Sequence, residues 1–227
     1  MTITQQFALP FPQTQHYRAE DFLAGPCNDA AMTWLADPAV WPGRRLAVFG
    51  AAGTGKTHLL HVFCERTGAM LLPGPALRRL QAPPVAPALA IDDADCAPDP
   101  RSLLHLLNAA AEASQPVLLA ARTAPAHWGF GLPDLVSRLR AITTVRLDAP
   151  DDALLRALLA RLCADRQLAV PVTVQYYLLA RLPRTGSALR EAVARLDRMS
   201  LALGRRVSLA AAAVVAEAIV EKEAVLF

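Results

Sequence analysis

The chain has 227 residues, of which 54% are hydrophobic and 19% are charged, and its formal net charge is +3. This composition excludes an intrinsically disordered chain, which has few apolar residues and a large net charge. No apolar stretch approaches the roughly 18 residues that a membrane-spanning helix needs. The N-terminus lacks the positive start and long apolar core of a secretory signal. We therefore expect a cytoplasmic protein with no membrane partner.

Charge and cysteine content limit the other partners. A net charge of +3 is too small to indicate a nucleic-acid partner by itself. The four cysteines are Cys27, Cys64, Cys96 and Cys163. They are widely spaced and form no C-x-x-C pair, which argues against a metal site or a disulfide framework and suits a reducing compartment.

Short apolar runs alternate with helical patterns over the first two thirds of the chain. The expected strands are Leu46–Phe49, Ala69–Leu72, Ala88–Ile91, Val117–Ala120 and Thr143–Leu147. The expected helices are Asn28–Leu35, Thr57–Arg66, Ser102–Ala113 and Pro133–Arg140. Short apolar strands between helices are typical of a parallel sheet covered on both faces, so we predict an α/β core over residues 16–150. The proline-rich stretch 73–87 is expected to be a surface excursion with one helical turn.

The pattern changes at about residue 151, after which no further strand is expected. Helices are predicted over Asp152–Asp165, Val172–Ala180, Ser187–Leu203 and Ser208–Glu223. Asp151 and Asp152 lie where carboxylates stabilise the start of a helix. We therefore predict a small all-α C-terminal domain over residues 151–227.

The strongest motif directly follows the first apolar run. Residues 50–57 read G-A-A-G-T-G-K-T and match the phosphate-loop pattern G-x-x-x-x-G-K-[ST] between a strand and a helix. Glycines let several backbone N–H groups converge on one anion, and the helix directs its positive dipole end at the phosphates. Lys56 would contact the β- and γ-phosphates, and the Thr57 hydroxyl would bind Mg²⁺. The expected phosphate-binding residues are Gly50, Gly53, Thr54, Gly55, Lys56 and Thr57.

A second acidic motif completes the expected site. The apolar run 88–91 ends in Asp92 and Asp93. An apolar strand that ends in carboxylates fits a Walker B element, in which Asp92 holds Mg²⁺ and Asp93 polarises an attacking water.

With these motifs the chain resembles the AAA+ module of the DnaA family of bacterial replication initiators. The resemblance is carried by the phosphate loop with the following H-L-L-H, the Asp92–Asp93 pair and the helical C-terminal unit. The segment 22–31 resembles the family's F-x-x-G-x-x-N-x-x-A segment, which lies over the adenine. The resemblance implies that Phe22, Gly25 and His58 help to bind ADP or ATP, and that the helical domain is an AAA+ lid.

Two features resemble the Hda branch, a group of DnaA-related regulators. The sequence leaves no room after the lid for the helix-turn-helix domain of DnaA, so we expect no direct sequence-specific DNA binding. Residues 6–11 read Q-F-A-L-P-F and are similar to the peptide by which that branch binds the DNA polymerase sliding clamp. An extended peptide with a glutamine and apolar anchors suits such a pocket. The resemblance assigns residues 1–15 to clamp binding, through Gln6, Leu9, Pro10 and Phe11.

The segment 131–139 resembles the family's arginine-finger box and implies a catalytic role for Arg138. In the Hda branch this guanidinium acts on ATP held by DnaA, promotes its hydrolysis and so prevents re-initiation of replication. An arginine supplied in trans stabilises the charge on the transferring phosphoryl group and accelerates such reactions by about 10³- to 10⁵-fold. DnaA and the clamp are thus the implied partners, and a homo-oligomer is compatible with the resemblance.

The sensor positions depart from the family pattern. Ala120 and Arg122 occupy places where the family commonly has threonine and aspartate, with Thr123 as a displaced substitute. In the lid, Ser187 aligns with the sensor arginine, and Arg184 and Arg190 flank it. Missing positive charge at the γ-phosphate slows hydrolysis in cis, so we expect little ATPase activity of the chain's own. The alternatives are a self-sufficient AAA+ ATPase, such as a helicase loader or transposition helper, and a small-molecule P-loop kinase.

Overall fold

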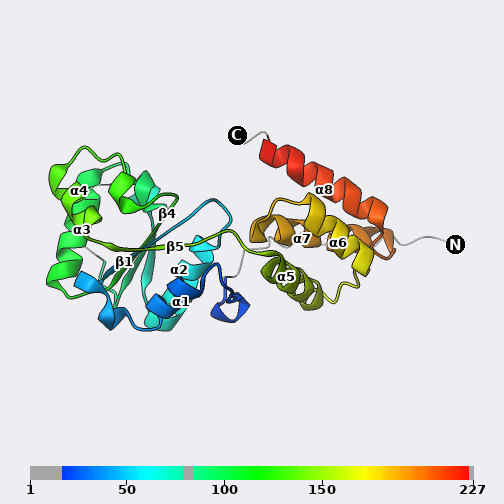
Figure 1. Cartoon of the computed structure of the whole chain (residues 1–227), viewed down its shortest axis with the longest axis horizontal. Helices are drawn as coiled ribbons and strands as arrows, with labels where there is room; N and C mark the ends of the chain where they lie inside the picture. Colours follow the sequence, from blue (N-terminus) through cyan, green and yellow to red (C-terminus); the bar gives the residue numbers. More distant parts are fainter. Residues whose placement is uncertain (1–16, 79–83, 225–227) are drawn as a thin grey trace. The chain divides into compact units, whose positions relative to one another are not determined.

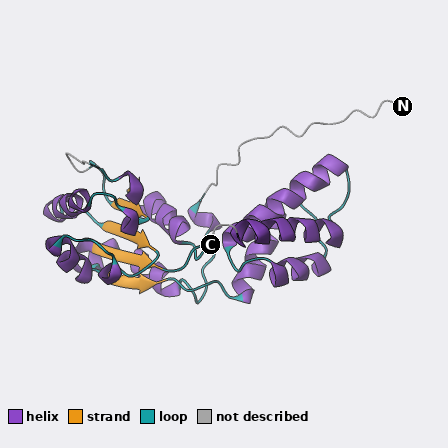
Figure 2. Ribbon diagram, turned by 90° about the horizontal axis from the view of Figure 1, so that it is seen from above, coloured by secondary structure: helices purple, strands orange, loops and turns teal. Residues whose placement is uncertain are grey.

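The computed structural model describes residues 17–78 and 84–224, which form two compact units (Figure 1). The first unit ends at Ala149 and the second begins at Pro150. The first contains strands and helices, and the second is entirely helical where it is described (Figure 2). Each unit is described by itself below.

The first unit is built on a five-stranded parallel sheet with the order β2-β3-β4-β1-β5. The strands are β1 (Arg45–Phe49), β2 (Met70–Pro73), β3 (Leu89–Asp92), β4 (Val117–Ala121) and β5 (Thr143–Arg146). β1 is first in sequence but lies between β4 and β5. Because all strands are parallel, the loops that follow β1, β3 and β4 leave the same edge of the sheet.

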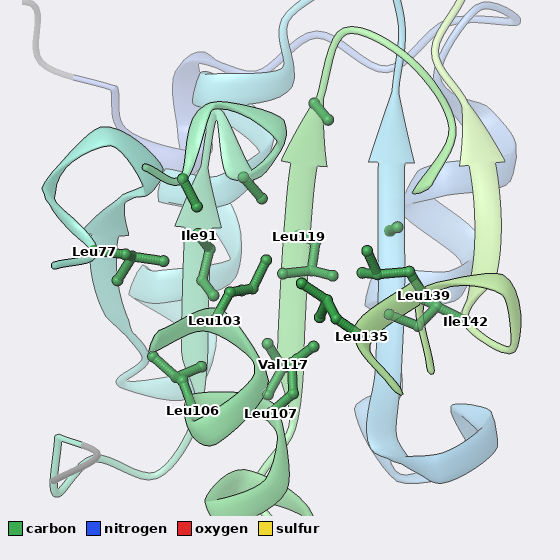
Figure 3. Close-up of a cluster of buried hydrophobic side chains, with 14 of the residues drawn as sticks. Leu77, Ile91, Leu103, Leu106, Leu107, Val117, Leu119, Leu135, Leu139 and Ile142 are labelled. Carbon is green, nitrogen blue, oxygen red and sulfur yellow. The ribbon is translucent and has the colours of Figure 1, made fainter. Parts of the chain in front are cut away.

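Helices cover both faces of this sheet, because alternate strand residues point to opposite sides. On one face, α1 (Asp29–Leu35) and α2 (Lys56–Thr67) pack on a cluster that includes Leu46, Val48 and Leu118. On the other face, α3 (Pro100–Glu112) and α4 (Pro133–Arg140) pack on a cluster that includes Ala47 and Leu119 (Figure 3). Short 3-10 turns connect these elements: η1 (Ala19–Asp21), η2 (Pro38–Val40), η3 (Pro42–Arg44), η4 (Gly74–Ala76), η5 (Ala94–Cys96) and η6 (Pro125–His127).

The second unit consists of four helices around their own apolar cluster. They are α5 (Asp152–Asp165), α6 (Val172–Arg181), α7 (Gly186–Leu203) and α8 (Leu209–Ala224). Asp151 caps α5 by accepting the Leu154 backbone N–H at 2.7 Å, and the Thr185 hydroxyl accepts the Ala188 N–H at the start of α7. Since side chains cap the starts of α5 and α7, the sequence can place these two boundaries closely.

The α/β fold with a helical C-terminal unit is confirmed, and the strand and helix ends fall close to the predicted ones. Gly68 ends α2 with a φ of 70°, a left-handed conformation in which glycine costs least. The stretch 73–87 contains the predicted turn, η4, but Gly74 and Leu77 are buried rather than on the surface. Among the described helices, none combines the length and apolar character that crossing a bilayer requires.

Candidate functional site

The predicted phosphate loop links β1 to α2, and its glycines adopt conformations that other residues resist. Gly53 and Gly55 have φ values of 78° and 96°, and Gly55 is the residue that precedes α2. At Gly50 a Cβ atom would lie 2.4 Å from the Leu147 carbonyl oxygen. The loop therefore needs glycine for backbone shape at two positions and for close approach at a third. This geometry fits a loop whose backbone amides surround a phosphate.

Lys56, the first residue of α2, holds its ammonium group inside the loop. The side chain is 8% exposed, and Nζ donates to the carbonyl oxygens of Gly50 and Ala51 at 2.8 Å each. Burial lowers the pKa of Lys56, although the negative charges of Asp92 and Asp93 act in the opposite direction. A cation in this position suits the oxygens of a bound polyphosphate.

Thr57 and Asp92 meet at the end of β3. The Thr57 hydroxyl donates to Asp92 Oδ2 at 2.7 Å, so two oxygen groups of the types that Mg²⁺ prefers are adjacent. No group of three or more histidine, cysteine or acidic side chains that could hold a metal occurs within residues 17–78 and 84–224. A Mg²⁺ ion here would thus need phosphate oxygens or water to complete its coordination, which fits a nucleotide-bound ion.

Asp93 follows Asp92 in a strained conformation. Its φ of 48° lies in the left-handed region, where it begins the turn η5. Burial raises the pKa of Asp93, and the nearby carboxylates of Asp92 and Asp95 raise it further. Gly74 lies directly against this residue, since a Cβ at Gly74 would be 2.1 Å from the Asp93 carbonyl oxygen. Gly74, the buried residue of the turn η4, therefore packs directly against the backbone of the predicted Walker B element.

The segment before α1 lies against the phosphate loop and the start of α2. The Phe22 ring contacts His58 edge to face, with centroids 5.1 Å apart, and a Cβ on Gly55 would lie 3.8 Å from the same ring. Gly25 donates its backbone N–H to Asn28 Oδ1 at 3.0 Å. The structure thus brings Phe22 and His58 together beside the loop, whereas the contact of Gly25 is with Asn28.

Further contacts hold this segment along α2, and no sequence motif predicts them. The Tyr17 ring stacks on His61 with centroids 4.8 Å apart. His58 Nε2 lies 2.9 Å from the Arg18 carbonyl oxygen, so it donates, and the Ala19 N–H donates to Glu65 Oε2 at 2.7 Å. Positions 58, 61 and 65 share one face of the helix. Their helical spacing in the sequence indicates this common face, but it does not indicate that residues 17–19 pack on it.

Arg138 lies in the last turn of α4 and is exposed. Its charge is close enough to Arg45 to lower the pKa of that residue, after the larger effect of burial. Arg45 is the first residue of β1, whereas the phosphate loop follows the last. At about 3.3 Å per residue, β1 alone separates these two edges of the sheet by about 13 Å. Since α4 ends shortly before Thr143, and Thr143 lies opposite Leu46 near the start of the parallel strand β1, Arg138 and the phosphate loop belong to opposite edges of the sheet.

The sensor positions differ in what they offer to a nucleotide: Ala120 has no polar group, whereas the charge of Arg122 is close enough to Lys56 and Asp93 to lower the pKa of both, an effect smaller than that of burial. Ala120 is buried at the end of β4, and the Arg122 backbone N–H donates to Asp95 Oδ2 at 3.3 Å. In the helical unit, Ser187 Oγ donates to Thr185 Oγ1 at 3.1 Å, and Arg184 forms an exposed ion pair with Asp152 at 2.7 Å. The residues predicted to bind the clamp, Gln6, Leu9, Pro10 and Phe11, lie outside the described residues.

A family model described as the lid domain of Hda matches residues 151–210, which comprise α5, α6, α7 and the start of α8. No curated protein sequence matches the chain.

Solved structures share the fold at low sequence identity. Domain III of the replication initiation protein DnaA from Thermotoga maritima is 19% identical with a TM-score of 0.78, and the match covers 92% of this chain and 99% of that one. AMPPCP-bound DnaA from Aquifex aeolicus is 16% identical with a TM-score of 0.67, covering 83% and 66%. A mutant of RuvB from Thermotoga maritima is 17% identical with a TM-score of 0.66, covering 89% and 73%. The chain thus combines an AAA+ fold with a helical domain of the Hda lid type.

Proposed function

We propose that this chain is a DnaA-related regulator of replication initiation. It holds an adenine nucleotide in its own phosphate loop, binds the polymerase sliding clamp through residues 6–11, and uses Arg138 to stimulate hydrolysis of ATP held by DnaA. The resemblance to the Hda lid and the fold shared with DnaA domain III support this proposal.

Nucleotide binding is supported by the loop geometry and the groups around it. Backbone amides of the loop and the Lys56 ammonium would hold the phosphates, while Phe22 and the region around His58 would face the base. Thr57 and Asp92 would hold Mg²⁺, which neutralises phosphate charge when bound. The same fold occurs in a DnaA structure with AMPPCP, which is consistent with an adenine nucleotide here.

The observation that carries the proposal is the position of Arg138. It is exposed, and the helix that carries it ends at the sheet edge opposite the phosphate loop, so it is available to a second molecule and remote from a nucleotide in its own loop. A guanidinium that enters another subunit's site accelerates hydrolysis by about 10³-fold or more. That factor corresponds to about 4 kcal/mol of barrier.

The altered sensor positions favour a chain that keeps its own nucleotide. Ala120 has no polar group, and neither Ala120 nor Ser187 supplies a cation for a γ-phosphate. Without such groups, selectivity for ATP over ADP and hydrolysis in cis both weaken. We therefore propose that ADP is the resident nucleotide and that the intrinsic ATPase activity is low.

The test compares two exposed arginines of the same helix. ATP hydrolysis by DnaA is measured with clamp-loaded DNA and wild type, Arg138→Ala or Arg140→Ala. We expect Arg138→Ala to lose nearly all stimulation while it still binds ADP and the clamp, and Arg140→Ala to retain it. Full stimulation by Arg138→Ala would exclude this residue as the trans-acting group.

The clamp tether needs its own experiment. A pull-down on the sliding clamp compares the wild-type chain with the double variant Leu9→Ala and Phe11→Ala. We expect the double variant to lose binding, because both substitutions remove apolar anchors. Equal binding by the two proteins would rule out this peptide as the tether.

A self-sufficient AAA+ ATPase remains the second candidate, and its supporting observation is the adjacent Thr57, Asp92 and Asp93. Such a protein would hydrolyse ATP without clamp or DnaA. Robust turnover by the purified chain alone, lost in Asp93→Asn, would favour this candidate over the regulator.

A further inference from the structure

Residues 17–22 form a short segment whose two ends lie against the same side chain of α2. The ring centroid of His58 is 5.3 Å from that of Tyr17 and 5.1 Å from that of Phe22. The His58 side chain is buried, and its Nε2 donates to the Arg18 carbonyl oxygen at 2.9 Å. His58 therefore joins both ends of the 17–22 segment to the helix that begins at the phosphate loop.

Two further contacts hold this segment farther along α2. The Tyr17 ring stacks on the His61 ring, with centroids 4.8 Å apart and an interplanar angle of 22°. The Ala19 backbone N–H, at the start of the turn η1, donates to Glu65 Oε2 at 2.7 Å. At a rise of 1.5 Å per residue, His61 and Glu65 lie about 8 and 14 Å along the helix from Lys56. These two contacts therefore act on the 17–22 segment rather than on phosphate bound at Lys56.

Asn28 holds the chain on the other side of Phe22. This side chain is buried; its Nδ2 donates to the Leu23 carbonyl oxygen, and its Oδ1 accepts the Gly25 N–H, both at 3.0 Å. Phe22 itself is half-buried, and a Cβ on Gly55 would lie 3.8 Å from its ring. Phe22 is thus held from both directions along the chain, with part of its surface exposed beside the phosphate loop.

We propose that His61 and Glu65 are positioning residues for the base of the bound nucleotide. Through Tyr17 and Ala19 they hold the 17–22 segment on α2, so Phe22 is in place before the base arrives. A side chain that is already ordered loses less conformational freedom when it binds. This inference rests on the proposed function and adds to its nucleotide site two residues that do not touch the nucleotide.

The first test compares ADP with pyrophosphate, which carries phosphate groups but no base. Calorimetry in the presence of Mg²⁺ measures both affinities for wild type, His61→Ala and His61→Phe. We expect His61→Ala to weaken ADP binding about three- to tenfold, as the loss of one aromatic pair implies, and to leave pyrophosphate binding unchanged. His61→Phe keeps a ring for Tyr17 and should bind ADP nearly as wild type does. Unchanged ADP affinity in His61→Ala, or an equal loss for ADP and pyrophosphate, would overturn the proposal.

The second contact and a matched control use the same assay. Glu65→Ala removes the acceptor of the Ala19 N–H and should weaken ADP binding about two- to fivefold, whereas Glu65→Gln keeps an oxygen acceptor and should not. His105→Ala, at an exposed position of α3, should leave both affinities unchanged. An undiminished ADP affinity in Glu65→Ala would remove Glu65 from the proposal, and a loss in His105→Ala as large as in His61→Ala would overturn it.

A double variant tests whether His61 acts through Phe22. If it does, His61→Ala added to Phe22→Ala weakens ADP binding no further, because the group being positioned is gone. A full additional loss would contradict the proposal. Failure of the proposed function is a different result: Lys56→Met would then bind ADP as wild type does. Urea unfolding followed by tryptophan fluorescence verifies that each variant folds.

Discussion

Replacing Lys56 with methionine separates nucleotide binding from folding. The ammonium is 8% exposed and donates to two loop carbonyls, so the methionine removes the charge but fills a similar volume. Because burial lowers the pKa of Lys56, the charge itself costs stability at neutral pH, and its loss offsets the lost hydrogen bonds. Without nucleotide, we expect the free energy of unfolding of the variant to lie within about 1 kcal/mol of that of wild type. Nucleotide affinity should fall much further.

The magnitude follows from the loss of one partner in a buried charge pair. Such a loss costs about 2–5 kcal/mol, and 2.7 kcal/mol corresponds to about 100-fold in Kd. At an ADP concentration of 100 times the wild-type Kd, ligand binding stabilises wild type by about 2.7 kcal/mol. The variant, whose Kd then equals that concentration, gains only about 0.4 kcal/mol.

The assay is urea unfolding with and without ADP and Mg²⁺. All three tryptophans, Trp34, Trp41 and Trp128, precede Ala149, so their fluorescence reports on the α/β unit alone. Lys222→Met is the control, since Lys222 is the only other lysine and lies in α8. An undiminished ADP-dependent gain in Lys56→Met would refute the role of this ammonium.

Three further substitutions test the site and the fold. Thr57→Val removes the hydroxyl that bonds to Asp92, so the Mg²⁺-dependent part of ADP affinity should disappear in calorimetry while the Mg²⁺-free part remains. Asp93→Asn should raise the free energy of unfolding at pH 7 by at most about 1 kcal/mol. The raised pKa of Asp93 means that its ionised form destabilises the fold. The gain should therefore be largest above the raised pKa of folded Asp93, shrink as pH falls through that pKa, and vanish below the ordinary pKa of aspartate; a gain independent of pH contradicts it. Leu178→Ala, at a fully buried position of α6, should lower the free energy of unfolding of the helical unit by about 2–5 kcal/mol. Unfolding followed by helical circular dichroism should show this loss, while the transition followed by tryptophan fluorescence stays in place. A shift of both transitions would show that the two units unfold together.

Local signals explain the elements that the sequence placed well. The helices α4 and α5 have the predicted ends, because Pro133 begins one and the Asp151 carboxylate caps the other. The phosphate loop was predictable for the same reason: its pattern occupies consecutive residues and depends only on the strand before it and the helix after it.

Contacts between distant segments were not predictable from one sequence. Nothing in the proline-rich stretch indicated that Gly74 would lie against Asp93, because the need for glycine arises from a strand close in space rather than in sequence. The stacking of Tyr17 on His61 has the same origin. Likewise, the arginine-finger resemblance named Arg138 but not its place at the sheet edge opposite the loop, which follows from the parallel pairing of β5 with β1.

The central claim is that the nucleotide in this chain and the nucleotide that is hydrolysed belong to different molecules. The most direct measurement loads γ-labelled ATP on either DnaA or this chain, with unlabelled ADP on the other, and follows phosphate release in one turnover on clamp-loaded DNA. Our account predicts rapid release only when the label is on DnaA, and no acceleration with Arg138→Ala. Rapid release from label held by this chain, insensitive to Arg138→Ala, would contradict it.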